Sequence, residues 1–322
     1  MKSRDLTDLL LLATIWGSSF LFMRMAVPAF GPVALAFVRV AGAAGVLLPL
    51  LVLRGEGPLL KRHWRPLLVL GLSNSALPFL CFGYALTTLP AGLAAIFNAA
   101  TPLSTALIAR AWLGVPLTRW RSLGLALGFG GVAGLAVYKS LFSGTSSAAT
   151  AALQFDAATA LAIAACLAGT LMYGHAASYA KQALPGVPSM VMAAGTQLAA
   201  AVALAVPAAL TWPAVMPGAR DWLAVAALAV LASAAGYILY FRLITRVGPT
   251  GASSVTFLVP VFAAAWGALL LGEAVTLPML IGGTVILAGT ALVLGLLPRP
   301  HADGPGGGPG RGPDGGPGGV PA

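Results

Sequence analysis

The chain has 322 residues, of which 59% are hydrophobic and only 8% are charged, and its formal net charge is +10. Soluble domains usually carry about 25% charged residues, and so few charges could not cover this much apolar surface in water. Composition therefore excludes a soluble globular protein and predicts a multi-pass membrane protein whose apolar surface is accepted by a lipid bilayer.

Apolar windows of about 20 residues, divided at Pro, Gly and clusters of charge, predict an all-α membrane protein with ten transmembrane helices. The boundary between the third and fourth helices is drawn at Pro90 and Gly92, because no charge marks it. The first window follows Lys2 and Arg4, as in a signal peptide, but it is long enough to span the bilayer and we expect it to be retained. In chain order, the windows lie near residues 6–26, 33–53, 66–86, 91–110, 121–138, 157–179, 188–210, 221–241, 250–271 and 278–297.

The basic residues predict the orientation, since short loops rich in Lys and Arg stay in the cytoplasm. They lie in gaps between apolar runs and are not interleaved with aromatic residues, which indicates a topology signal and no nucleic-acid partner. We therefore expect a protein of the cytoplasmic membrane with both termini in the cytoplasm. Most of the 18 basic residues fall on one side when the gaps are counted alternately: Lys2, Arg4, Arg54, Lys61, Arg62, Arg65, Arg110, Arg119, Arg121, Lys181, Arg242, Arg246, Arg299 and Arg311.

The second half of the chain repeats the first after a shift of 158 positions (260 − 102), which places Pro102 on Pro260. Each half contains an odd number of predicted helices, so equivalent loops must lie on opposite sides of the membrane and their charges should reverse. They do, because Arg119 of the first half falls on Leu277 of the second. The sequence therefore predicts two inverted repeats.

Four segments follow from this pattern. Two five-helix repeats occupy residues 6–138 and 157–297, and a loop of small and polar residues, 139–156, joins them. The tail, residues 298–322, consists mostly of Gly and Pro, which cannot bury enough apolar area to offset the entropy of ordering. We expect this tail to be disordered and cytoplasmic.

Glu273 interrupts the apolar stretch 258–280, in the predicted external turn between the last two helices, and its counterpart in the first repeat is Val115. The first interpretation is a solvated turn carboxylate near a helix start, where the helix dipole favours a negative charge. A gating or coupling group is the alternative.

Polar side chains within the apolar windows predict a substrate site, because a polar group at bilayer depth is costly unless it faces a cavity or a partner. Arg39 lies about six residues into the second window, where it can contact an anionic group or helix carbonyls. The amides can bind a solute or hold helices together, and the aromatic residues can line a cavity or simply pack. The candidate substrate-binding residues are Trp16, Ser19, Arg39, Asn74, Tyr84, Asn98, Tyr173, His175, Gln197 and Tyr237.

Three further features bear on mechanism. Transport is either passive or coupled to protons through His175, since the acidic residues are terminal or in loops; a structural histidine is the other interpretation. Pro102 and Pro260 each remove a backbone hydrogen bond and are expected to kink equivalent helices, with or without a role in gating. The GxxxG patterns between Gly124 and Gly134 favour packing within the chain, while a homodimer stays open.

The chain resembles the drug/metabolite transporter superfamily in its ten-helix EamA-like branch. The resemblance covers residues 6–297 and is carried by "IWGSSFLFMRMAV", "FVRV", "NAATPLSTALIARAWLGVPLT" and "LVPVFAAAWGALLLGEAVT". It implies two inverted five-helix EamA-type repeats around a central cavity that opens alternately to either side, and small organic solutes carried without a prosthetic group. The family usually has Glu after "LLLG" in both halves, and here the first half has Val115.

These observations predict a secondary transporter of small organic metabolites such as amino acids or related compounds. The sequence contains no GxxxxGK[ST] loop, which disfavours an ATP-driven pump. An intramembrane enzyme would need clustered nucleophiles, bases or metal ligands at membrane depth, so no enzymatic activity, cofactor or metal is expected. A channel or a non-transporting membrane scaffold is the alternative.

Overall fold

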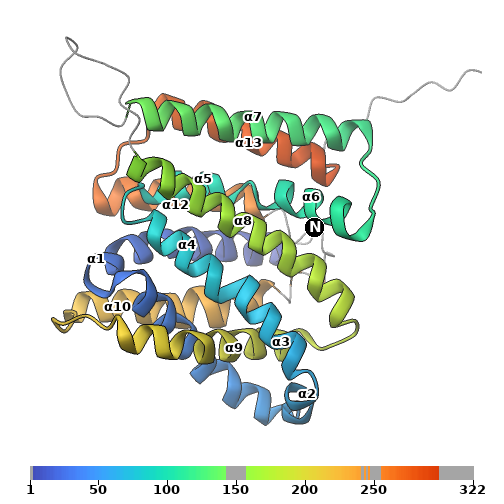
Figure 1. Ribbon diagram of the computed structural model, residues 1–322, viewed down its shortest axis with the longest axis vertical. Coiled ribbons are helices and arrows are strands. Elements are labelled where there is room, and N and C mark those ends of the chain that lie inside the picture. Colours follow the sequence, from blue (N-terminus) through green and yellow to red (C-terminus); the bar gives the residue numbers. More distant parts are fainter. Residues whose placement is uncertain (1–2, 143–156, 241–242, 244–245, 247–254, 297–322) are drawn as a thin grey trace, which may run out of the picture.

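A computed structural model describes residues 3–142, 157–240, 243, 246 and 255–296, and every regular element in these ranges is helical. The long helices lie roughly side by side across the molecule (Figure 1). The elements are α1 (Ser3–Leu53), α2 (Gly57–Arg62), α3 (Trp64–Gly71), η1 (Leu72–Ala76), α4 (Leu77–Ala85), α5 (Ala91–Asn98), α6 (Thr101–Leu113), α7 (Arg119–Phe142), α8 (Ala157–Ala183), α9 (Ser189–Leu210), α10 (Ala219–Ala227), η2 (Leu228–Ala235), α12 (Val255–Leu271) and α13 (Leu277–Leu294).

These elements form the ten predicted membrane crossings. Seven helical stretches in the described ranges are long and apolar enough to span a bilayer, and α12 is a shorter apolar helix. The stretch within α1 has 50 residues, enough for two crossings, and its backbone breaks at Gly31 (φ 70°, ψ 163°), a conformation that essentially only glycine adopts. The elements α3, η1 and α4 form one crossing, as do α5 with α6, and α10 with η2. The remaining crossing is α7, which packs along α13 (Figure 1).

Close helix crossings show the inverted repeat in three dimensions. A Cβ added to Gly17 of α1 would lie 2.6 Å from the Cβ of Phe262 in α12. One added to Gly174 of α8 would lie 2.9 Å from the carbonyl carbon of Ser104 in α6. The second pair is the first pair shifted by one repeat, with the two halves exchanged (174 − 17 = 157 and 262 − 104 = 158). The prediction of two inverted five-helix repeats is confirmed.

Glycines also bring α7 and α13 together across the two repeats. A Cβ on Gly289 would lie 2.5 Å from the backbone nitrogen of Gly128 and 2.6 Å from the carbonyl oxygen of Gly124. Small residues allow helix backbones to approach closely and gain dispersion contacts, which apolar lipid does not oppose. These two glycines of the predicted GxxxG patterns therefore pack within the chain.

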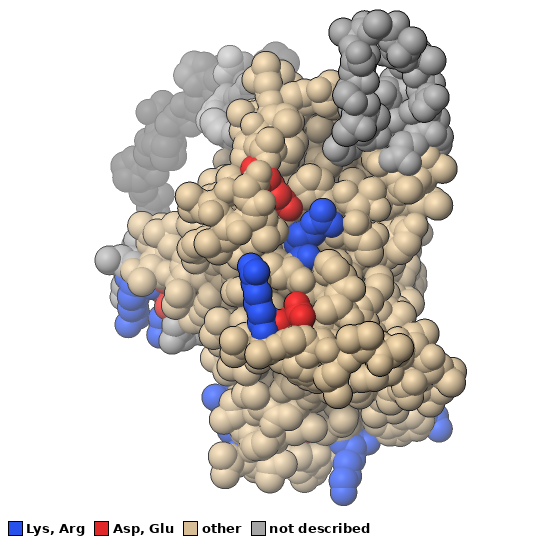
Figure 2. Space-filling model, turned by 90° about the vertical axis from the view of Figure 1, so that its left-hand side faces the viewer, with Lys and Arg blue, Asp and Glu red and all other residues tan. Residues whose placement is uncertain are grey.

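The two ends of the helix bundle differ in the turns that they carry. The connection between α6 and α7 lies at the right-hand end in Figure 1, and the turns between α4 and α5 and between α12 and α13 lie at the left-hand end. We call these the Arg121 end and the Glu273 end. Figure 2 looks onto the Glu273 end, where apolar residues cover most of the surface and a few acidic and basic groups lie next to one another.

Candidate functional site: a cavity between the repeats

A cavity of about 530 Å³ lies between the two repeats and takes its walls from both of them. The first repeat contributes residues from α1, η1, α4, α5 and α6, and the second contributes residues from α8, η2, α12 and α13. The cavity reaches the α6–α7 connection at Val115 and Leu117 and continues to Arg121. Glu273 does not line it, so the cavity extends to the Arg121 end and stops short of the Glu273 end.

Most of the residues predicted for the substrate site line this cavity. Trp16 and Tyr173, which are equivalent at a shift of 157 (173 − 16), face it from the two repeats. Their shared position explains how inverted repeats place similar side chains around one space. The predicted residues that line the cavity are Trp16, Ser19, Arg39, Asn74, Asn98, Pro102, Tyr173 and Tyr237.

Four predicted residues lie outside the cavity. Tyr84 is 41% exposed near the end of α4. His175 follows Tyr173 by two residues, which turns it about 200° around α8, and it stacks on Trp112 with ring centroids 4.9 Å apart. Gln197 is fully buried and donates to Ser75 from α9. Pro260 is buried within α12.

Arg39 is the cationic side chain that α1 places deep in this cavity. Only 7% of the residue is exposed. Its Nε donates to Ser233 Oγ in η2 at 3.0 Å, its Nη1 lies 3.2 Å from Met23 Sδ, and its guanidinium covers the ring of Phe79 at 3.8 Å. These contacts fix the guanidinium plane but do not neutralise its charge. Of the described residues that line the cavity, none is acidic.

The Arg39 contact has a counterpart in the other half of the molecule. Arg39 of the first repeat bonds to Ser233 of the second, and Gln197 of the second repeat bonds to Ser75 of the first at 3.1 Å. The two serines are equivalent (233 − 75 = 158), and both lie in π-helical turns, which often occur at functional sites. Only the copy with the arginine opens to the cavity, so one copy supports packing and the other provides a charge.

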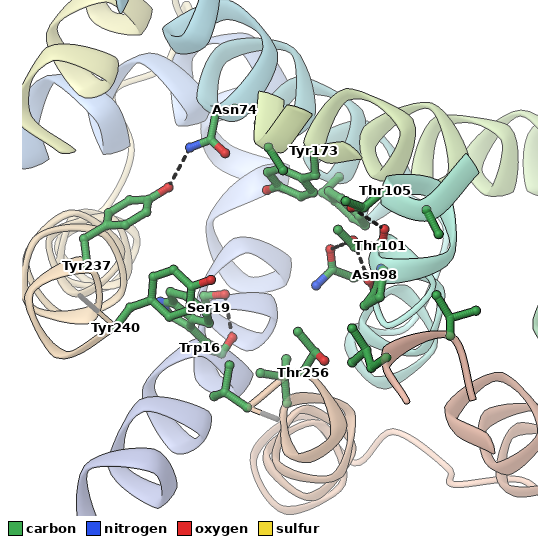
Figure 3. A pocket seen from close by; sticks show the side chains of 18 of the residues that line it. Trp16, Ser19, Asn74, Asn98, Thr101, Thr105, Tyr173, Tyr237, Tyr240 and Thr256 are labelled. Carbon is green, nitrogen blue, oxygen red and sulfur yellow. Dashed lines mark hydrogen bonds between the residues drawn. The ribbon is translucent and has the colours of Figure 1, made fainter. Parts of the chain in front are cut away.

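Aromatic rings form one wall of the cavity (Figure 3). The ring of Trp16 lies 5.2 Å from that of Tyr240 and 6.4 Å from that of Tyr237, and its Nε1 donates to the Ala232 carbonyl at 3.1 Å. Asn74 Nδ2 donates to the Tyr237 hydroxyl at 3.1 Å. Hydrogen bonds at their polar tips hold these rings in place, so they offer rigid apolar surface to a solute.

The opposite wall is a broken helix. The chain leaves helical geometry between Asn98, at the end of α5, and Thr101, at the start of α6. Pro102 occupies the first turn of α6, where a missing N–H costs no helical hydrogen bond. Thr101 Oγ1 donates to the Asn98 carbonyl at 2.7 Å, and the Asn98 amide nitrogen points into the cavity (Figure 3). The predicted kink near Pro102 is thus a helix break, whereas α12 runs continuously through Pro260.

Glu273 closes the other end of the molecule. Its two carboxylate oxygens accept from the backbone N–H of Ala91, at 3.1 and 2.9 Å, and its side chain is only 15% exposed. Arg24 Nε lies 3.8 Å from the same carboxylate, and Arg24 Nη1 donates to the Leu86 carbonyl. The interpretation of Glu273 as a solvated turn carboxylate is therefore wrong. The carboxylate caps α5 of the opposite repeat, 182 residues away in sequence.

The equivalent turn at the Arg121 end has the same backbone but lacks this tether. Gly114 and Gly272 both end their helices with a positive φ, of 67° and 66°. Val115 then occupies the place of Glu273, and it lines the cavity. A Cβ on Gly267 would lie 2.5 Å from Glu273 Oε2, so this glycine makes room for the carboxylate. The structure is therefore tied shut where the turn carries Glu and open where it carries Val.

Sequence reasoning missed three residues that shape the Arg39 site: Met23, Phe79 and Ser233. Ser233 gave a usable signal, because a hydroxyl within an apolar run must find a partner. Met23 and Phe79 gave none, since apolar side chains at membrane depth look alike whether they face lipid, the core or a cavity.

Comparisons with known proteins agree with this architecture. The sequence pattern of the EamA-like transporter family matches residues 7–137 and again residues 160–295. The chain is 29% identical to "Uncharacterized inner membrane transporter YedA" of Escherichia coli over 289 residues, covering 87% of this chain and 88% of that protein. It is 27% identical to "Uncharacterized transporter YvbV" of Bacillus subtilis over 295 residues, covering 91% and 92%.

A solved crystal structure has the same fold, with a TM-score of 0.63 at 20% identity, over 92% of this chain and 98% of the other. The relatives named above are membrane transporters, and the family pattern occupies both halves of the chain, as the inverted repeats require. This multi-pass membrane protein belongs to the EamA-like transporter family.

Proposed function

We propose that this protein is a secondary transporter that carries small organic metabolites through the cavity by alternating access. The observation that supports this most strongly is the one-sided cavity between inverted repeats. It reaches the Arg121 end, while the tether between Glu273 and Ala91 closes the opposite end. A carrier must have such a state, and inverted repeats allow a second state in which the two halves exchange conformations.

The cavity volume sets the size of the solute. About 530 Å³ lies within the range of about 300–1,000 Å³ that small-molecule sites usually have. Amino acids and related compounds fit this range, and their polar groups would find donors on Arg39 and Asn98. With the Arg121 end in the cytoplasm, as the basic loops predict, the described state is open to the cytoplasm.

Release on the other side requires the Glu273 tether to open. The carboxylate would have to leave the start of α5, and Arg24 and the α4–α5 turn would separate from the α12–α13 turn. In this proposal Glu273 acts as a gate: it stabilises one state through contacts that the other state lacks, and a ligand or mutation shifts the balance only by its differential effect on the two states.

Solute counterflow in proteoliposomes tests this function. A thermal-shift screen of the purified protein against metabolites first identifies a stabilising solute. Vesicles loaded with that solute should then take up the labelled solute faster than empty vesicles, because a loaded carrier returns faster. Equal rates in loaded and empty vesicles would show a channel, and no uptake of any stabilising solute would indicate a non-transporting protein.

A further inference from the structure

The buried charge of Arg39 identifies a group that the transported solute should carry. A guanidinium at membrane depth is costly, and proteins normally pair it or expose it to a water-filled space. Arg39 is only 7% exposed, and no carboxylate lies among the described residues that line its cavity. The site therefore has a cation whose counter-charge must come with the ligand.

The geometry of Arg39 favours a planar anion. A guanidinium has five N–H donors, and the contacts within the described part of the chain use one on Nε and one on Nη1, the latter toward a weakly accepting sulfur. Nη2 has no hydrogen-bond partner there. Phe79 covers one face of the group at 3.8 Å, so the edge is left for a ligand. Two parallel N–H groups on one edge match the two oxygens of a carboxylate.

The remainder of the cavity suits an apolar body. Trp16, Tyr237 and Tyr240 form an aromatic wall, and their polar atoms already have partners in the protein. Such rings bind apolar and aromatic groups through their faces. Asn98 adds one further donor from the broken helix, directed into the cavity (Figure 3).

The cavity offers no acidic partner for an ammonium group. A cationic amine would add a second positive charge beside Arg39, and a zwitterion would leave the net charge of the site unchanged. A carboxylate without an ammonium neutralises it. Arg121 at the mouth adds positive potential along the entry path, which favours the approach of anions.

We infer that the transported solute is an organic monocarboxylate with an aromatic or branched apolar body, that its carboxylate pairs with Arg39, and that it needs no ammonium group. This inference rests on the proposed function, because it assigns the substrate class of the same cavity. The contact of Arg39 with Ser233 orients the guanidinium, and Phe79 stacks on it from one side.

Three probes with one skeleton test the assignment on the purified full-length chain in lipid nanodiscs, by calorimetry. They are 3-phenylpropionate, which has only the carboxylate, L-phenylalanine, which has both groups, and phenethylamine, which has only the ammonium. We expect 3-phenylpropionate to bind at least as tightly as phenylalanine, and phenethylamine to bind roughly tenfold more weakly or not at all.

Variants then locate the carboxylate. Arg39→Gln should weaken 3-phenylpropionate binding by roughly 30-fold or more, since removing one partner of a buried charged pair costs about 2 kcal/mol at least. Arg39→Lys keeps the charge but loses the planar fork, so its loss should be smaller. Arg65→Gln, which removes an exposed arginine on α3 outside the cavity, should change nothing and is the matched control.

Four results would overturn the inference. These are tighter binding of phenethylamine than of 3-phenylpropionate, tenfold tighter binding of phenylalanine than of 3-phenylpropionate, unchanged affinity in a folded Arg39→Gln variant, and no binding of 3-phenylpropionate at millimolar concentration. The first, second and fourth need no variant. Counterflow separates this outcome from the proposed function: a carrier that exchanges amines rejects only the substrate class, and a carboxylate that binds without exchange rejects only transport.

Discussion

Removing the charge of Glu273 should open the end of the molecule that it closes. In Glu273→Gln the amide oxygen can still accept from Ala91, but the bond is no longer charge-assisted, which costs about 1 kcal/mol. The ion pair with Arg24, at 3.8 Å and partly exposed, contributes about 0.5 kcal/mol more. The total of about 1.5 kcal/mol corresponds to roughly a tenfold shift toward the state open at the Glu273 end.

Accessibility of a cavity cysteine measures this shift. Cys81 and Cys166 are replaced by alanine, Ser19→Cys is introduced as a reporter that lines the cavity, and a membrane-impermeant thiol reagent is added from the Glu273 side. Labelling from that side should be roughly tenfold faster in Glu273→Gln than in the parent. Gly267→Ala should act in the same direction, because its Cβ displaces the carboxylate without removing its charge.

A second carboxylate at the same end provides the control. Asp221 Oδ2 accepts from the Gly218 backbone N–H at 3.0 Å, as a cap within one helix start that does not join the two repeats. Asp221→Asn should lower stability by about 1 kcal/mol or less and leave labelling from the Glu273 side unchanged. Equal labelling rates in Glu273→Gln and in the parent, with both proteins folded, would refute the tether as a gate.

Three further predictions concern the cavity and the helix packing. Ser233→Ala should weaken carboxylate binding roughly threefold to tenfold, because Arg39 loses the acceptor that orients it, and calorimetry should show no such loss in Gln197→Leu, whose cost of about 1 kcal/mol falls on stability alone. Gly289→Ala should lower the thermal midpoint, at a cost of about 1–3 kcal/mol, since its Cβ would meet backbone atoms, whereas Gly130→Ala, which has open space, should be neutral or stabilising; the reverse order would contradict the packing described. His175→Ala should leave pH-gradient-driven uptake in proteoliposomes unchanged, and a loss of that uptake would show that this histidine carries the coupled proton.

The ten crossings and their inverted arrangement could be predicted because they depend on quantities that sequence states directly. Apolar length predicts a crossing, and Pro90 with Gly92 marked the break before α5 correctly. The reversal of charge between the halves required inversion, since each half has an odd number of helices.

The direction in which a side chain faces could not be predicted as well. In a soluble helix the polar face reveals which side is buried, but here lipid and core are both apolar, so the pattern around the helix axis is weak. Tyr173 and His175 illustrate this limit. Both are polar aromatic residues at similar depth in α8, and only Tyr173 reaches the cavity. Depth was readable from the sequence and rotation was not.

Long-range partners were also beyond sequence reasoning. Glu273 was placed correctly in a turn near a helix start, but its partner is the backbone of Ala91, which carries no side-chain signal at all. The same holds for Arg39, whose burial could be expected but whose stacking on Phe79 depends on how α1 meets α4.

The central claim, that one cavity serves both sides of the membrane in turn, is tested most directly by locking the closed end. Ala91→Cys and Glu273→Cys, joined by a short bifunctional thiol reagent with a reducible link, would hold the turn against the start of α5. The account predicts that the cross-linked protein still binds its solute from the Arg121 side, shows no counterflow, and recovers exchange on reduction. Counterflow at the same rate before and after cross-linking would contradict it.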